Sequence, residues 1–240
     1  MTTTTAALGQ FGDAIDFIFN QHESPSGGAQ VGGLSKMWDL LWPHLKLSGA
    51  AMGVACAVSI PIGLWLGHIG KGGFLAINAS NVGRAVPSLA LIAFFVAYIG
   101  VGFTNLMLAL VLLAIPPILT NAYTGVRQVD RDTVESARGM GLTGAQVVRR
   151  VELPLALPLI FGGIRISAVN VVATATIAPL AGVVTLGDPI INVNTYGDEG
   201  RLAAAIVVAL LAVVTEVSLG AVQRAVTPRG LKIQRREATP

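Results

Sequence analysis

Four polar side chains interrupt the most apolar runs of the chain, where hydrocarbon surroundings make them costly. Arg165, Asn170 and Thr174 follow one another in one run, and Glu216 lies well inside another. Ionisable side chains in such runs commonly pair with one another or face a water-filled path. We expect Glu216 to pair with Arg165 or to hydrogen-bond Asn170, as a structural bond between helices or as a gating residue. Asn170 and Thr174 share a helix face at i, i+4, and either line a path or bond a neighbouring helix.

No other side chains have the spacing that catalysis or metal binding needs. His22, His44 and His68 are far apart, and Cys56 is the single cysteine. Metal sites need clustered ligands, so we expect no metal and no internal disulfide. The stretch 67–72, GHIGKG, has the wrong spacing for a nucleotide-binding P-loop. We therefore expect that the chain is not an enzyme and does not hydrolyse ATP itself.

The composition indicates the surroundings of these side chains. Hydrophobic residues make up 53% of the 240 residues, charged residues make up 12%, and the mean hydropathy is +0.69. A soluble domain is usually about 25% charged, so this composition indicates a membrane protein. We expect no nucleic-acid partner despite the net charge of +3, because the basic residues alternate with apolar runs.

Five runs are expected to be membrane-spanning helices. They are residues 45–66, 74–99, 103–120, 155–178 and 202–222. Pro116 and Pro117 are expected to break the third of them. The stretch 179–200 is rich in glycine and proline, which argues against a further span and favours a re-entrant or outer-surface segment.

The N-terminal segment, 1–43, is expected to be amphipathic and extracytoplasmic. Apolar residues at helical spacing predict a helix that is too short to span a membrane. They are Phe11, Ala14, Ile15, Ile18 and Phe19. This helix either lies in the membrane interface or packs on the bundle. The stretch 24–33, SPSGGAQVGG, is expected to be a flexible connector.

The basic residues predict the orientation. If the segment between the third and fourth spans is inside, inner segments hold two basic residues in 71–84, five in 127–150 and five in 224–236. These are 12 of the 16 basic residues, so the positive-inside rule places the N-terminus outside and the C-terminus inside. An odd number of spans agrees with this orientation, and 225–240 becomes a basic cytoplasmic tail.

The segment 127–154 is then a charged cytoplasmic loop. Thr133 is expected to cap a short helix, with acidic residues near its N-terminal end. Gly139 and Gly141 are expected to end this helix, because glycine accepts a positive φ at low cost.

A second helix is expected over 144–151, capped by Thr143, before Pro154 opens the fourth span. The resulting helix–glycine–helix unit presents a small, rigid projection on the inner face. The small side chains of Ser136 and Ala137 allow another surface to come close.

The spacing of this loop resembles the coupling loop, the "EAA" loop, of ABC importer permeases. The resemblance is carried by Glu135, Ala137, Gly141, Val151, Leu153 and Pro154. The family has alanine where this chain has Ser136, and often isoleucine where it has Val151. The resemblance implies that residues Glu135, Ser136 and Ala137 form a coupling helix that docks into a groove on a cytoplasmic ATPase.

The resemblance extends over about residues 44–228. Within the family, the chain is similar to one branch, the permeases of osmoprotectant importers for glycine betaine, carnitine, choline or proline betaine. Its other matching stretches are 44–48, 86–91, 121–125, 151–158, 163–165 and 173–176. One departure is the sequence GVVT at 182–185, where the branch usually has a glycine pair before Leu-Gly-Asp. This departure bears on the gate and on the substrate.

The resemblance implies an all-α membrane protein, a type I ABC importer permease bundle of about five transmembrane helices with a cytoplasmic coupling helix. The permease domain would be 44–224, and the chain would form half of a pathway for an osmoprotectant such as glycine betaine. It would bind no cofactor, because ATP and Mg would bind a partner ATPase dimer. Further partners would be a second permease chain, identical or homologous, an extracytoplasmic substrate-binding protein and membrane lipid. The location would be a prokaryotic plasma membrane.

Two other interpretations stay open. The first keeps the class but changes the cargo to methionine or another amino acid. The second is a secondary carrier without an ATPase, although such carriers often show internal repeats and none is evident here. Only 6% of the residues are aromatic and no tight Trp/Tyr cluster is expected, so substrate choice is assigned mostly to the binding protein.

Overall fold

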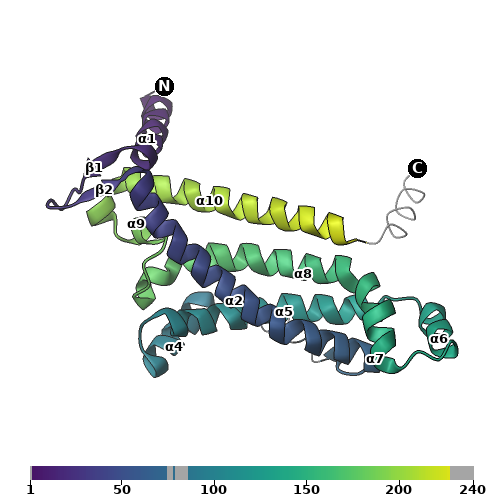
Figure 1. Ribbon diagram of the computed structural model, residues 1–240. Helices are drawn as coiled ribbons and strands as arrows, with labels where there is room; N and C mark the ends of the chain where they lie inside the picture. Colours follow the sequence, from purple (N-terminus) through teal and green to yellow (C-terminus); the bar gives the residue numbers. More distant parts are fainter. Residues whose placement is uncertain (1, 75–77, 79–85, 228–240) are drawn as a thin grey trace. The chain divides into compact units, whose positions relative to one another are not determined.

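The computed structural model describes residues 2–74, 78 and 86–227, and these residues are mostly helical (Figure 1). The chain divides into two compact units, which we describe separately. Unit 1 is built from Met1–Ala51, Pro87–Leu110 and Asn170–Val214. Unit 2 is built from Met52–Val86, Val111–Val169 and Thr215–Pro240.

Among the described residues, four helical stretches are long and apolar enough to cross a membrane. They are Gly33–Ile69 (α2), Phe103–Arg127 (α5), Gly144–Ala181, which contains α8 (Leu153–Thr174), and Val193–Val226 (α10). They confirm an all-α membrane protein. Within the predicted second span, the structure describes the 12-residue helix α4, Ser88–Ile99, and a few residues before it. Residues 75–77 and 79–85 of that span, and 228–240 of the predicted tail, lie outside the described residues.

The predicted break at the proline pair is wrong, because α5 continues through Pro116 and Pro117. A proline removes a backbone N–H and leaves helix carbonyls short of donors. Hydroxyl groups of neighbouring segments of unit 2 donate to carbonyls beside the pair. Ser167 donates to the Ala114 carbonyl at 2.9 Å, and Ser59 donates to the Ile115 carbonyl at 3.4 Å. The carbonyls that lose an N–H donor to the prolines are those of Leu112 and Leu113, four residues earlier, so the two hydroxyls hold neighbouring segments against α5 and do not replace the lost bonds.

Unit 2 is held together by close helix approach. A methyl group added at Gly63 would lie 2.6 Å from the Ala122 side chain, and one at Gly67 would lie 2.7 Å from Val126. Both contacts are too short for real atoms, so these glycines bring α2 against α5. The core beside them consists of Ala122, Val126, Ala156 and Ile160.

Unit 1 begins with helix α1, Thr2–Phe19, followed by a small hairpin of β1, Gln21–Glu23, and β2, Gln30–Gly32. The prediction of a flexible connector over 24–33 is therefore wrong in its second half. Val31 is buried and anchors β2 to a core that holds side chains of α1, α2 and α10. The helix predicted at the N-terminus is confirmed.

The stretch after α8 has no further span, as its glycines and prolines predict. It contains a 3-10 helix, Ala175–Ala181, and a short helix α9, Asp188–Ile191. Gly187 lies directly against the Thr176 carbonyl, which leaves no room for a side chain. Helix α10 starts earlier than the predicted fifth span and has a non-helical residue at Gly197, with φ 71°.

Candidate coupling site and intramembrane polar residues

The predicted coupling helix is α6, Arg131–Gly139, in unit 2. The N-cap of this helix is Asp130. The sequence had suggested Thr133, so that prediction is wrong. The Asp130 carboxylate accepts from the Thr133 backbone N–H at 3.0 Å and from the Thr133 hydroxyl at 2.9 Å. These bonds favour the ionised form, the backbone one most, and lower the pKa of Asp130. The helix thus starts three residues earlier than an N-cap at Thr133 would allow.

The other end of α6 is closed by a Schellman motif around Gly141. The Leu142 N–H donates to the Ala137 carbonyl at 3.2 Å, and the Gly141 N–H donates to the Arg138 carbonyl at 2.9 Å. This pattern requires a left-handed residue after the helix, and Gly141 has φ 87°. A side chain at Gly141 would meet nothing within 4 Å, so the requirement for glycine comes from the backbone alone.

The three predicted contact residues of α6 differ in exposure. Glu135 and Ser136 are exposed, whereas Ala137 is 3% exposed and faces inward. Met140, a large apolar side chain that follows α6, is 75% exposed. The exposed surface of α6 therefore combines an acid, a small hydroxyl residue and an apolar tip.

Thr143 caps the next helix, α7, Gly144–Val147, as predicted. Its hydroxyl accepts from the Gln146 backbone N–H at 3.4 Å, and the Gln146 side chain accepts from the Thr143 N–H at 2.8 Å. This reciprocal capping box fixes the start of α7.

The second helix, expected over 144–151, instead changes after Val147 to a π-helical turn, Val148–Glu152, that leads directly into α8. The Leu153 N–H donates to the Val148 carbonyl, five residues back. Pro154 has no N–H to donate, so the wider turn ends at the residue before it. Leu153 and Pro154 are half-buried at the start of α8 and connect the loop rigidly to the span.

A buried pair beneath the loop was missed from the sequence. The Nδ1 atom of His68, at the end of α2, lies 2.8 Å from a carboxylate oxygen of Glu152 in the π turn. Their side chains are 16% and 5% exposed. The two residues are 84 positions apart, so no local pattern links them. The available signal was an ionisable residue at the end of an apolar run in each case.

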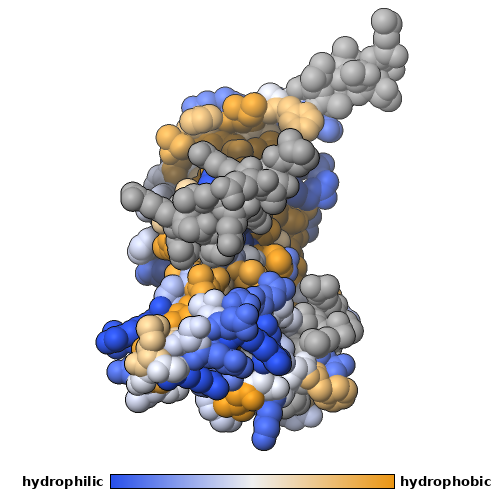
Figure 2. Space-filling view, turned by 90° about the vertical axis from the view of Figure 1, so that its right-hand side faces the viewer, coloured by the Kyte–Doolittle hydropathy of each residue, from blue (hydrophilic) through white to orange (hydrophobic). Residues whose placement is uncertain are grey.

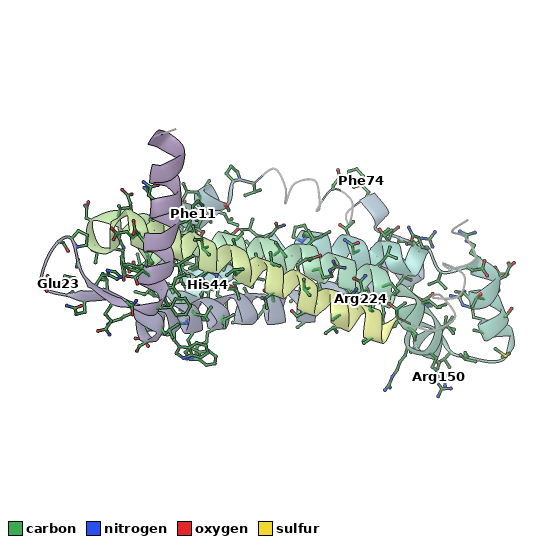
Figure 3. The ribbon with its side chains drawn as sticks, turned by 90° about the horizontal axis from the view of Figure 1, so that it is seen from above. Phe11, Glu23, His44, Phe74, Arg150 and Arg224 are labelled. Atoms are coloured by element: carbon green, nitrogen blue, oxygen red, sulfur yellow. The ribbon has the colours of Figure 1, made fainter. Side chains whose placement is uncertain are left out.

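Charged side chains gather around this pair and α6. Figure 2 faces the side of the molecule that carries α6 and α7, and hydrophilic residues predominate over hydrophobic ones in the lower part of that view. A cleft of about 220 Å³ lies there, lined from α6 by Arg131, Glu135 and Arg138. Arg149 and Arg150 of the π turn are exposed, and Arg150 projects outward from the ribbon in Figure 3. Among the described residues no cluster of metal ligands is found.

The intramembrane polar residues fall into two sets. In unit 2, the Arg165 guanidinium of α8 donates to Glu216 and, at 2.5 Å, to the side-chain oxygen of Gln223, both on α10. Gln223 in turn donates to the Pro158 carbonyl at 2.7 Å. Arg165 and Glu216 are thus paired, which is one of the two partnerships considered from the sequence. Their side chains are still 30% and 42% exposed, so this chain does not cover the pair.

Asn170 and Thr174 belong to unit 1. Asn170 is exposed and Thr174 is half-buried, and no side-chain hydrogen bond of Asn170 is found within the described part of its unit. Their role stays a prediction.

The family model for "Binding-protein-dependent transport system inner membrane component" matches residues 59–230. The chain belongs to this family. It is therefore a membrane-embedded permease component, and the family implies an ATPase, a binding protein and a second permease as partners. The matched residues include α6, α7 and every residue of the predicted coupling loop.

Curated relatives show which branch of the family this chain resembles. The carnitine transport permease protein OpuCB of Listeria monocytogenes is 41% identical over 192 residues, 80% of this chain and 88% of that protein. The glycine betaine/carnitine/choline transport system permease protein OpuCB of Bacillus subtilis (strain 168) is 38% identical, over 79% of this chain and 88% of that protein. These relatives confirm the resemblance to osmoprotectant importer permeases.

Solved structures support the fold. An inward-facing structure of the MetNI methionine ABC transporter matches with a TM-score of 0.69 at 21% identity, covering 81% of this chain and 98% of that chain. An amino acid ABC transporter with histidines matches with a TM-score of 0.59 at 19% identity, covering 80% of this chain and 93% of that chain. The type I importer permease fold predicted from the sequence is confirmed.

Proposed function

We propose that this chain forms half of the translocation pathway of an ATP-driven importer for a small quaternary-amine osmoprotectant such as glycine betaine. One observation carries the proposal: an exposed helix, α6, is closed at both ends by specific caps, and the next helix, α7, continues without a break through the π turn into a span. Such a preformed surface suits docking by a moving partner, because little conformational entropy is lost when it is bound.

The proposed arrangement has the N-terminus outside and the C-terminus inside, so that α6 projects into the cytoplasm. Glu135, Ser136, Ala137 and Gly141 make or support the contact with an ATPase dimer, and Leu153 and Pro154 connect it to α8. ATP and Mg bind to that ATPase, and this chain binds no cofactor. Closure of the ATPase pair brings two coupling helices together and opens the pathway outward, where a binding protein releases the solute.

The partly exposed Arg165–Glu216 pair supports the proposal that a second membrane-embedded chain packs on this face. Charged groups in hydrocarbon are expensive unless protein or water covers them, and this chain leaves 30% of the Arg165 side chain and 42% of the Glu216 side chain exposed. A second permease chain, identical or homologous, would cover this face and complete the pathway. Asn170 and Thr174 are proposed to line the same pathway.

The cargo is proposed from relatives whose names specify carnitine, glycine betaine or choline. The likeness to a methionine transporter is one of fold at 21% identity and carries no argument about cargo. The GVVT sequence at 182–185 leaves room for a preference among quaternary amines that differs from that of the relatives.

Uptake into proteoliposomes tests the proposal. The permease is reconstituted with its ATPase and binding protein, and uptake of labelled glycine betaine, carnitine, choline and methionine is measured with and without ATP. We expect ATP-dependent uptake of at least one quaternary amine and none of methionine. Uptake of methionine alone would contradict the proposed cargo. Uptake that persists without the ATPase would show a secondary carrier.

A further inference from the structure

Helix α1 has three distinct faces in unit 1. Ala14 and Phe17 are fully buried in the unit 1 core, so this face packs on the bundle. Asp13 and Asp16 form an exposed polar face, which Asn20, the residue directly after the helix, extends. The third face is apolar but not covered.

The uncovered face is a stripe of three large apolar side chains. Phe11, Ile15 and Phe19 are 51%, 52% and 60% exposed and follow one another at i, i+4 and i+8. We call them the α1 stripe. A buried face, an apolar exposed face and a polar exposed face on one helix are more than packing on the bundle requires.

The direction of α1 shows what the stripe can meet. Figure 1 and Figure 3 view unit 1 from two perpendicular directions, and in both α1 is steeply inclined to the N-terminal part of α10; in Figure 3 it crosses that part. Because α10 is one of the spans, a helix that lies across it is oriented along the membrane surface. An interfacial helix has this orientation, with its apolar side in the acyl region and its polar side in water.

A second group in unit 1 marks the level of the interface. Trp38 and Trp42 at the start of α2 are 58% and 48% exposed and stack with ring centroids 6.2 Å apart. The Lys46 ammonium lies 5.0 Å from the centre of the Trp42 ring. Exposed tryptophans with a lysine are typical of the headgroup region of a span. This stacked pair was not expected from the sequence.

We propose that the α1 stripe is a lipid-contact surface that lies in the membrane interface where α2 and α10 begin. The occupant is the acyl region of uncharged lipid and not an anionic headgroup. Helix α1 carries two aspartates and no basic residue, so attraction to anionic lipid has no source on it. The inference is independent of the cargo and of the ATPase.

Spin labels on the assembled transporter in nanodiscs test the proposal. In a Cys56→Ser background, single cysteines replace Phe11, Ile15 or Phe19, and Asp13→Cys and Asn20→Cys serve as matched controls on the polar face. Collision with oxygen, which concentrates in lipid, is compared with collision with a water-soluble nickel chelate. All five positions are exposed, so the substitutions remove no buried contact.

The stripe positions should favour oxygen over nickel several-fold, and the controls should show the reverse. The ratio should not change when zwitterionic lipid is replaced by anionic lipid. Preference for nickel at the stripe would overturn the proposal, because it would place the stripe in water. Protection of the stripe from both reagents would also overturn it, because a protein partner would then cover this face.

Discussion

At the residue scale, Gly141 is under the strictest backbone constraint of the coupling loop. Its φ of 87° lies in the left-handed region, and the two bonds that close α6 depend on this conformation. Gly139, two residues earlier, ends α6 without a positive φ. Both positions are open, since an added side chain would meet nothing within 4 Å at either. Substitutions at these two positions therefore distinguish the effect of backbone conformation from that of a steric clash.

Gly141→Val should reduce transport several-fold, and Gly139→Ala should leave it close to wild type. A left-handed conformation costs an L-residue roughly 1–2 kcal/mol, and more for a β-branched one, so the valine variant loses the turn that orients α6. Membrane insertion should be the same for both. Solute uptake and co-purification with the ATPase measure the difference, and equal uptake by both variants would contradict the assigned role of the turn.

Asp130 gives a pH prediction. Its folded-state pKa is lowered, so the cap stabilises α6 above the ordinary carboxylate pKa and is lost as the pH falls through the lowered value. Transport should therefore show no pH dependence that arises from Asp130 between about pH 6 and pH 8, far above an aspartate pKa near 3.9. Asp130→Asn, which retains a capping oxygen, should couple like wild type, whereas Asp130→Ala should couple less well. Uptake by the two variants across this pH range checks the prediction; a fall specific to the asparagine variant would show that charge matters more than capping.

At the element scale, the loop is positioned by a buried pair and by close helix packing. The apolar spans and the glycine turn at Gly141 follow from the sequence, because hydropathy and the preference of glycine for a positive φ are local properties. The N-cap of α6 was wrongly assigned to Thr133 because Asp130 and Thr133 are both good capping residues and lie only three positions apart. The β1–β2 hairpin and the His68–Glu152 pair depend on contacts between distant segments, which periodicity does not reveal.

His68→Leu should destabilise unit 2 more than Glu152→Gln. Removing the histidine leaves a buried carboxylate without its partner, which costs about 3–5 kcal/mol, whereas glutamine can still bond a neutral imidazole. Thermal unfolding of the purified chain in detergent provides the comparison. If the two variants unfold at the same temperature, the pair contributes packing alone.

Gly67→Val should also lower the unfolding temperature, because its side chain would collide with Val126. Overpacking of this kind costs about 1–3 kcal/mol. Gly53→Val on the same helix is the matched control, since nothing lies within 4 Å of an added side chain there. The same thermal assay applies, and equal losses for both would refute the close α2–α5 contact.

At the scale of the whole molecule, the chain is incomplete without partners. Its spans leave the Arg165–Glu216 pair partly open, and its loop offers an exposed surface that nothing in the described part of the chain covers. Exchange of the two charges, Arg165→Glu with Glu216→Arg, distinguishes the two roles considered for Glu216. We expect the exchange to restore the assembly that either single change weakens, because the pair is a bond between helices. Failure to restore assembly, measured by co-purification of the second permease, would favour a direct pathway role.

The most direct test of the account is a cross-link from α6 to the ATPase. Ser136 is exposed on α6 and is replaced by cysteine in the Cys56→Ser background, with Asp13→Cys of α1 as the control. In membranes holding the complete transporter, a cysteine-reactive photo-cross-linker should join the 136 variant to the ATPase chain and should not join the 13 variant to it. A cross-link from position 13 alone, or labelling of position 136 solely by reagents outside the cell, would contradict the account.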